Sequence, residues 1–242
     1  MIILGEDKNT INLTEINSET DFVAKNEEFI NFCRKISEIS TKAGNLDDLN
    51  NIKIDGVAIK DLVVSLVSKI GENIKLRRFK KILKENYKSA FYVHNKVNNN
   101  MGKIISVVKY NSKNEESAKF ASNICMHIAA MSPMALNEDN LDSDFINKEK
   151  KIIEEQIDKN GKKAEILEKI VKGKLNKVIS ENTLLSQKWV IDQELTVNQA
   201  VENFNKEYSD NFKILDFFKF KVGEGIEVKK MDFSEEVKSL TK

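Results

Sequence analysis

The chain contains little that bends or crosslinks a backbone. Its 242 residues include one proline and nine glycines, and this scarcity favours long helices over a turn-rich all-β fold. Two cysteines, Cys33 and Cys125, lie far apart and form no Cys-x-x-Cys pair. The cysteine content therefore argues against a disulfide scaffold and predicts a reducing, cytoplasmic setting.

No charge of one sign dominates the composition, and no long apolar run is present. Lysine and arginine (39) nearly balance aspartate and glutamate (38), which leaves a net charge of +1. A chain so balanced has no strong field to attract nucleic acid or an anionic membrane. It also lacks the run of about 18 apolar residues that a membrane span needs. Residues 1–7 turn acidic without a basic region, so no targeting segment is expected.

The motifs of common enzyme sites are also missing. The sequence has no Walker P-loop, no glycine-rich dinucleotide fingerprint, no nucleophile elbow and no zinc-spaced set of cysteine and histidine. His94 and His127 are the two histidines, which rules out a histidine-rich metal site. Cys125 and His127 lie two positions apart on an expected helix and would point in different directions. An enzyme active site is therefore not expected. A concealed carboxylate site would need clustered acids in a pocket, and the sequence shows no sign of one.

Hydrophobic periodicity outlines a strand followed by two helices in the first part of the chain. Apolar residues alternate with polar ones over residues 11–16, which predicts a strand. Asn26 is a candidate N-cap with acids in the following turn. Apolar residues then recur at helical spacing, first up to Gly44 and again over residues 59–70. The polar residues 45–55 between these helices are expected to form a loop.

The same order, a strand followed by a helix, returns later in the chain. Residues 87–94 and 104–110 are rich in β-branched and aromatic residues and flank a polar turn, which predicts a β-hairpin. A helical apolar face follows over residues 118–130 and ends before Pro133. Alternation over residues 214–222 predicts a strand that completes the sheet of the hairpin. The expected fold class is α+β, with two similar subdomains that each have a small antiparallel sheet and packed helices.

Residues 138–180 differ from the rest because they are rich in lysine and glutamate. Narrow apolar stripes on either side of Asn160 and Gly161 predict two antiparallel helices, which form an inserted coiled-coil arm. The expected domains are an N-terminal core subdomain (1–86), a C-terminal core subdomain (87–136 and 190–228), the helical-hairpin arm (137–189) and a C-terminal helical tail (229–242).

Asp21 and Phe22 stand at the corner between the first strand and its helix, which is an unusual place for an aromatic residue. In one interpretation Asp21 caps the turn and Phe22 is an ordinary core residue, because an apolar residue next to a strand end is usually buried. In the other, Phe22 projects and inserts into a partner, where the Asp21 carboxylate competes for a cation or a backbone donor. The residues themselves leave both interpretations open.

Three further positions have both a structural and a functional interpretation. His94 is either a solvated histidine at a hairpin end or a polar contact on the same surface as the corner. His127, beside the apolar face of its helix, is interpreted as a residue that holds helix and sheet together. The basic residues 69–78 lack interleaved aromatics, so a structural role for Gly71 and Glu72 at the end of the helix is favoured over nucleic-acid binding.

Several short motifs, taken in order, carry a resemblance to a known family. They are Thr-Asp-Phe-Val-Ala-Lys-Asn at 20–26, Lys-Ile-Gly-Glu-Asn-Ile at 69–74 followed by two arginines, His-Ile-Ala-Ala at 127–130 and Val-Gly-Glu-Gly-Ile at 222–226. The first motif is highly specific, and the others follow it in register. A chain with these motifs resembles the elongation factor Ts family over nearly its whole length.

The resemblance implies a guanine-nucleotide exchange factor that does no covalent chemistry and needs no cofactor of its own. Its implied partner is elongation factor Tu bound to GDP and magnesium, without direct contact to nucleic acid or membrane. The implied partner-binding residues near the magnesium site of that partner are Thr20, Asp21, Phe22 and Val23. Phe22 would act as a wedge between helices, and Asp21 and His94 would help to displace the groups that hold the ion and the phosphates. A homodimer, or a complex with two copies of each protein, is left open.

Two departures from the family pattern accompany this expectation. Family members usually open with a small three-helix, ubiquitin-associated-like domain, and this chain begins about where that domain would end. Lys188 and Trp189 stand where the family often has proline and phenylalanine. The alternative function is a non-catalytic interaction module, which uses the arm for a coiled-coil contact and has no effect on nucleotide.

Overall fold

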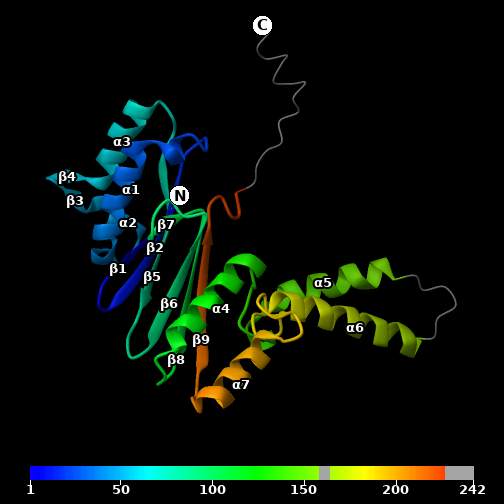
Figure 1. The fold of residues 1–242 in the computed structure, drawn as a ribbon. Coiled ribbons are helices and arrows are strands. Elements are labelled where there is room, and N and C mark those ends of the chain that lie inside the picture. The colour runs from blue at the N-terminus through cyan, green and yellow to red at the C-terminus, as the bar shows by residue number, and fades with distance from the viewer. Residues whose placement is uncertain (158–163, 227–242) are drawn as a thin grey trace, which may run out of the picture.

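Two antiparallel sheets lie face to face at the centre of the molecule, with helices on both outer surfaces. The computed structural model describes residues 1–157 and 164–226. Figure 1 shows the two sheets between two groups of helices, and a further pair of helices that projects from the second half of the chain. The expected fold class is therefore confirmed: small antiparallel sheets with packed helices form an α+β structure.

Three strands from residues 2–83 and a short strand at residues 101–102 form the first sheet. Its strands are β1 (Ile2–Glu6), β2 (Thr10–Asn17), β5 (Lys75–Leu83) and β7 (Met101–Gly102), in the order β5-β2-β1-β7. β1 pairs with β2 from Ile2 opposite Glu15 to Glu6 opposite Ile11. On its other side β1 pairs with β7, where Gly102 lies opposite Ile2. The segment between the two strands of the predicted hairpin thus supplies one edge of the first sheet.

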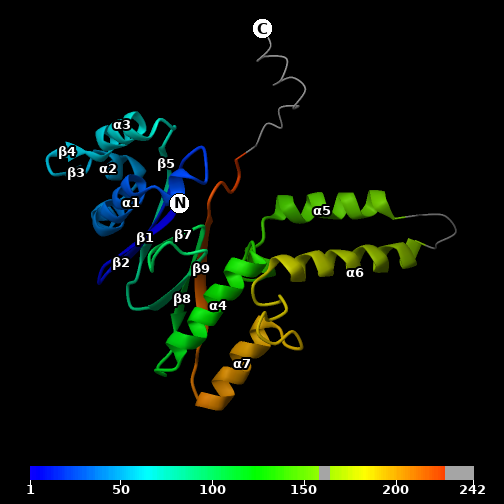
Figure 2. The same cartoon turned by 45° about the horizontal axis from the view of Figure 1, so that its top comes forward.

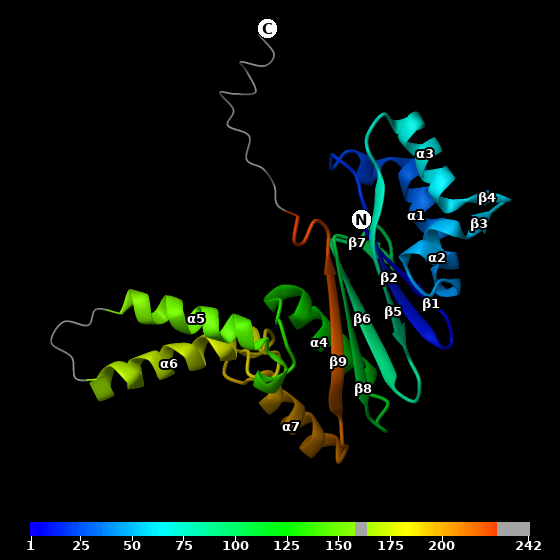
Figure 3. The same ribbon diagram turned by 180° about the vertical axis from the view of Figure 1, so that it is seen from behind.

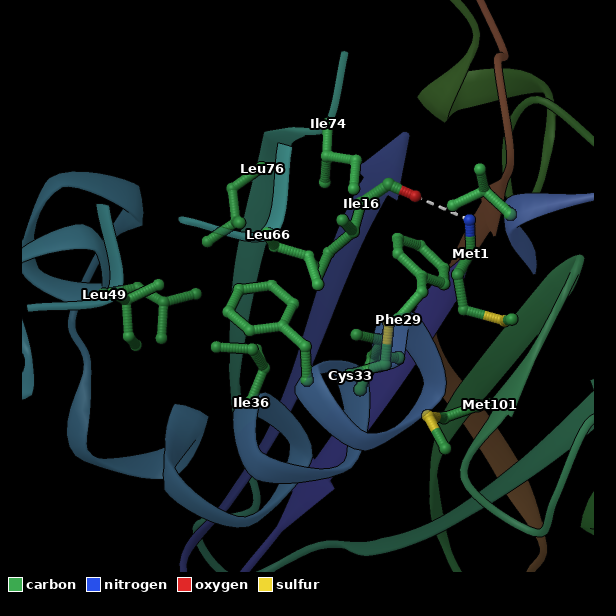
Figure 4. Packing of buried hydrophobic residues seen from close by; sticks show 14 of the residues in the cluster. Met1, Ile16, Phe29, Cys33, Ile36, Leu49, Leu66, Ile74, Leu76 and Met101 are labelled. Carbon is green, nitrogen blue, oxygen red and sulfur yellow. Dashed lines mark hydrogen bonds between the residues drawn. The ribbon is translucent and has the colours of Figure 1, made fainter. Parts of the chain in front are cut away.

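Helices cover the outer face of this sheet. They are α1 (Glu27–Ile39), α2 (Leu46–Asn51) and α3 (Ile59–Ile70), and a small hairpin of β3 (Lys53–Ile54) and β4 (Val57–Ala58) lies between α2 and α3. Phe29 and Ile36 of α1 pack with Ile16 of β2 in the enclosed core, and all three are fully buried (Figure 4). The apolar faces that the sequence predicts for the strand and for the helix therefore pack together in one cluster.

The expectation of a loop over residues 45–55 is wrong, because this segment contains α2 and β3. The Asn45 side chain accepts a hydrogen bond from the backbone N–H of Asp48 (2.9 Å) and so caps the start of α2. The short helix buries Leu49 completely. One apolar anchor and one cap suffice for a helix of six residues, which leaves little periodic signal in the sequence.

The first helix also ends earlier than expected. α1 stops at Ile39, and a 3-10 turn over Ser40–Lys42 precedes Gly44. The side-chain amide of Asn12 on β2 donates to the carbonyl oxygen of Ser40 (2.5 Å). Because a side chain of the sheet satisfies this carbonyl, the regular helix ends there and not at the glycine.

The second sheet consists of the hairpin that the sequence predicts and one distant strand. Its strands are β6 (Lys88–His94), β8 (Ile104–Asn111) and β9 (Lys213–Lys221), in the order β6-β8-β9. β9 pairs with β8 from Lys221 opposite Ile104 to Lys213 opposite Asn111. The prediction that residues 214–222 complete the sheet of the hairpin is therefore confirmed.

Two helices pack on the outer face of the second sheet. They are α4 (Ser117–Met131) and α7 (Val197–Tyr208). α7 begins with a capping box, in which the Thr196 hydroxyl accepts from Gln199 N and the Gln199 side chain accepts from Thr196 N. The aromatic rings of Phe120 and Phe204 stack between the two helices, with centroids 4.6 Å apart.

Apolar side chains from both sheets fill the space between them. The fully or almost fully buried members of this cluster are Ile2, Leu4, Ile11, Leu13, Ile82, Ile105 and Val107. Figure 3 shows the strands of the second sheet beside those of the first, with α1, α2 and α3 beyond the first sheet. The two halves of the chain share this core, so they cannot separate without exposing it to water.

Two long helices, α5 (Ser143–Gln156) and α6 (Ala164–Asn182), form the projecting arm (Figures 1 and 2). Its root is packed by a small cluster that includes Ala135, Leu141 and Ile179. The expected break at Asn160 and Gly161, and the expected tail over 229–242, lie outside the described residues. Within residues 1–157 and 164–226, no helix combines the length and apolar character needed to cross a bilayer.

The carboxylate of Glu15 on β2 joins the first sheet to the end of the second. Glu15 is 0% exposed. Its oxygens accept hydrogen bonds from Arg77 Nη1 (3.1 and 3.0 Å) and from Arg78 Nε, both on β5. The backbone N–H of Gly223, in the turn after β9, donates to the same carboxylate (2.8 Å). A buried charge requires such partners, and here the partners come from both halves of the chain.

Glu224, in the same turn, extends this cluster. Its carboxylate accepts hydrogen bonds from Arg78 Nη2 (3.2 Å) and from Lys219 Nζ (2.8 Å). Partial burial opposes ionisation, but the hydrogen bonds from Lys219 and Arg78 outweigh it, so the pKa of Glu224 lies below its ordinary value. We call Glu15, Arg77, Arg78, Gly223 and Glu224 the Glu15 clamp, since together they fasten the turn after β9 to β5.

Glu15→Gln keeps the size of the side chain and removes the charge that Arg77 and Arg78 bind. We expect the free energy of unfolding to fall by about 1.5–3 kcal/mol, the range for a hydrogen bond to a charged group. Urea unfolding followed by circular dichroism measures it. The control is Asp55→Asn, which breaks the exposed Lys35–Asp55 pair (3.6 Å) and should change stability by less than about 0.5 kcal/mol. Equal losses in both variants would contradict the role of the clamp.

Candidate functional site

The described residues contain neither a cluster suited to a metal ion nor an exposed cysteine. Residues 1–157 and 164–226 contain no cluster of three or more potential metal ligands. Cys33 and Cys125 are both buried as free thiols. Burial raises the pKa of the Cys33 thiol to about 12, and it raises the pKa of the Cys125 thiol as well. Thiols with raised pKa values are inert at neutral pH, because the thiolate is the reactive form.

The corner between β2 and α1 exposes its aromatic residue. Phe22 is 83% exposed, whereas Val23, which follows it, is 4% exposed. Val23 packs in the same apolar cluster as Ile16 and Phe29, which we call the first core. The interpretation of Phe22 as an ordinary core residue is therefore wrong, because Val23 and not Phe22 is buried in the core. A 3-10 turn over Val23–Lys25 leads to Asn26, whose side chain caps α1 as expected. We call residues 20–23 the corner.

Glu72 holds the first residue of the corner. Its carboxylate accepts hydrogen bonds from Thr20 N (2.9 Å) and from Thr20 Oγ1 (2.6 Å). Glu72 stands directly after Gly71, which ends α3 in the left-handed conformation (φ 80°). Sequence reasoning predicted the structural role of Gly71 and Glu72 at the helix end, but it missed the contact between Glu72 and Thr20.

Lys103, which lies 82 positions further along the chain, holds Asp21. Lys103 Nζ lies 3.1 Å from each carboxylate oxygen of Asp21. The backbone N–H of Lys103 donates to the carbonyl oxygen of His94 (3.1 Å). The corner and the end of the hairpin are thus linked through Lys103, and the sequence patterns did not predict this link.

His94 itself is exposed at the end of β6. The hydroxyl of Tyr92 lies 3.3 Å from His94 Nδ1, and the two rings are tilted with centroids 6.1 Å apart. The imidazole is therefore exposed beside Tyr92, while the backbone of His94 contacts Lys103.

His127 is fully buried, and its contacts differ from the expected ones. Val190 N donates to His127 Nδ1 (3.2 Å), so Nε2 carries the proton and donates to Gln187 Oε1 (2.9 Å). The ring also stacks on Trp189, with centroids 5.3 Å apart. The expectation that His127 holds helix and sheet together is wrong: it holds α4 against residues 187–190, which follow the arm. Burial lowers the pKa of this imidazole, although the hydrogen bond with Gln187 acts against the shift.

The corner thus displays an exposed aromatic ring beside two residues, Thr20 and Asp21, that are held by contacts from Glu72 and Lys103. Comparison with known proteins gives the particular class. A family model described as Elongation factor TS matches residues 19–224. The chain therefore belongs to the elongation factor Ts family, whose members are translation elongation factors.

Individual relatives agree with this assignment. Elongation factor Ts of Clostridium acetobutylicum is 37% identical over 240 residues, which cover 97% of this chain and 77% of that protein. The same factor of a Nitratiruptor species is 37% identical over 242 residues, with the same two coverages. That of Rickettsia bellii is 34% identical over 234 residues, 95% of this chain and 76% of the relative.

The buried His127 predicts a pH dependence of stability. The unfolded chain binds a proton near pH 6.5, while the folded chain, whose imidazole has a lowered pKa, stays neutral to lower pH. The free energy of unfolding should therefore fall as the pH drops below about 6.5. Denaturant unfolding at pH 7.5, 6.5 and 5.5 measures the decline.

His127→Gln should remove most of that decline, and the control His94→Gln should keep it, because His94 is exposed. Burial also lowers the pKa of the Met1 amino group, but this group is common to all three proteins and drops out of the comparison. A decline that persists unchanged in His127→Gln would contradict the assignment.

Proposed function

We propose that this chain is a guanine-nucleotide exchange factor, which binds GDP-bound elongation factor Tu and promotes release of GDP. The family supports this proposal, and one observation carries it: Phe22 is 83% exposed on a corner whose flanking residues are held in place. The exchange involves no covalent chemistry, and the chain brings no cofactor of its own. The cytoplasm is the proposed place of action, because the partner works in protein synthesis.

Phe22 supplies the binding energy of the corner. Inserting a phenylalanine side chain into an apolar site of the partner contributes roughly 1.5–3 kcal/mol. Thr20 and Asp21 approach the partner beside it, while the buried Val23 anchors the corner in the first core. Val23 thus contributes to binding through its packing and not through direct contact.

Asp21 and His94 supply the polar contacts. An exposed carboxylate that enters the magnesium site of the partner competes for the groups that hold the ion, and an exposed imidazole offers a donor or an acceptor beside it. Removal of the cation charge weakens the binding of the phosphates. The two ligands are therefore negatively coupled: the factor weakens GDP binding, and GDP weakens factor binding by the same ratio.

The second candidate function is a non-catalytic interaction module that binds through the arm. An open groove of about 620 Å³ lies between α5 and α6, and apolar residues such as Leu167, Val171 and Leu175 line it. Such a groove suits a coiled-coil contact. A chain that binds elongation factor Tu but leaves its GDP release rate unchanged would have this function instead.

Phe22→Ala tests the role of the corner. We expect the second-order rate constant for GDP release from elongation factor Tu to fall roughly tenfold to a hundredfold, which corresponds to the lost burial of the ring. Because the ring is exposed in the free chain, the thermal unfolding midpoint should stay the same. Release of fluorescently labelled GDP, followed by stopped flow, measures the rate constant.

The matched control is Val64→Ala, since Val64 on α3 is also strongly exposed (64%) and lies outside the corner. This variant should release GDP at the normal rate. A folded Phe22→Ala protein with full exchange activity would contradict the role proposed for Phe22.

A further inference from the structure

Lys103 forms polar contacts with both Asp21 and His94. Its ammonium group lies 3.1 Å from both Asp21 oxygens, and its backbone N–H donates to the His94 carbonyl oxygen. The ion pair is exposed: the side chains of Lys103 and Asp21 are 54% and 81% accessible. Its contribution to global stability is therefore small, and its effect should be local.

The backbone of Lys103 is fixed by the elements on either side of it. The preceding residue, Gly102, pairs with Ile2 in the first sheet, and the following residue, Ile104, begins β8 of the second sheet. A Cβ atom at Gly102 would lie 2.6 Å from the His94 carbonyl oxygen, so only glycine allows the approach. Lys103 thus projects from a rigid junction of the two sheets, which is a suitable base for orienting another residue.

Apart from Lys103, the corner is held at its two ends. Glu72 binds Thr20 before the aromatic residue, and Val23 is buried after it. Between these two points Asp21 has the Lys103 ion pair, and the Phe22 ring is exposed. Without Lys103, the Asp21 side chain would lose its ion pair, and the backbone hydrogen bond from Lys25 N to the Phe22 carbonyl oxygen (3.0 Å) would remain as a local restraint.

We propose that Lys103 is a positioning residue of the corner, which holds Asp21 and thereby keeps Phe22 in the conformation that binds the partner. This inference rests on the proposed exchange function. A corner that is ordered before binding loses less conformational freedom when the partner arrives. The pair also fixes the place of Asp21 relative to His94, so the two polar contacts from the two halves approach the partner together.

The first test needs no partner. The amides of Lys25 and Asn26 donate to the carbonyl oxygens of Phe22 and Val23 (3.0 and 2.9 Å), so their hydrogen exchange reports on the order of the corner. In Lys103→Met we expect both amides to exchange about two- to fivefold faster, the range for loss of one exposed ion pair. Lys103→Arg should restore the slow exchange, because it restores the charge.

The control is Lys96→Met, which removes an equal charge from the exposed turn between β6 and β7. This variant should leave the exchange of the Lys25 and Asn26 amides unchanged. If Lys103→Met also leaves them unchanged, the positioning role is overturned.

The second test measures GDP release from elongation factor Tu. Lys103→Met should lower the rate constant about two- to fivefold at low salt, and the loss should disappear near 0.5 M salt, because screening already removes the pair in the unchanged chain. In an Asp21→Asn background the same substitution should have no further effect. A loss that is independent of salt, or that adds fully to that of Asp21→Asn, would contradict the proposal.

The two tests separate this inference from the proposed function. If the unchanged chain does not accelerate GDP release at all, the exchange function fails. The amide exchange of Lys25 and Asn26 then still decides whether Lys103 orders the corner.

Discussion

The arrangement of this molecule depends on one buried carboxylate. Glu15 lies on β2 with no exposure to water, and its partners are two arginines of β5 and a backbone N–H in the turn after β9. A carboxylate in that place is costly unless all of these donors are present. The donors come from segments that are up to 208 positions away in the sequence. The charge therefore favours a single relative placement of the two sheets over other ways of packing two apolar faces.

This placement of the two sheets brings Lys103 close to the corner. β2 carries Glu15 and leads directly into the corner, while β7, which directly precedes Lys103, pairs with β1 at the edge of the first sheet. The corner is then held by Glu72, which follows α3, and by Lys103, which follows β7. The exposed Phe22 is thus displayed by a rigid frame that both halves build, and the clamp, the shared core and the corner form one continuous structure.

Sequence patterns predicted the features that local periodicity encodes. The hairpin, the returning strand β9, the N-cap at Asn26 and the long helices were all accessible in this way. β1 was not, because Ile2, Ile3 and Leu4 are apolar in succession and all buried, so they show no alternation. The contacts of Glu72 with Thr20 and of Lys103 with Asp21 span 52 and 82 positions. No local pattern encodes such pairs.

The central claim is that factor and nucleotide weaken each other on elongation factor Tu. The most direct measurement is the affinity of the chain for nucleotide-free and for GDP-bound elongation factor Tu, determined by titration calorimetry in the same buffer and at the same magnesium concentration. Negative coupling predicts tighter binding to the nucleotide-free form, by the same factor by which the chain lowers the affinity for GDP. Equal affinity for the two forms would contradict the account, since a ligand that does not distinguish two states cannot shift the balance between them.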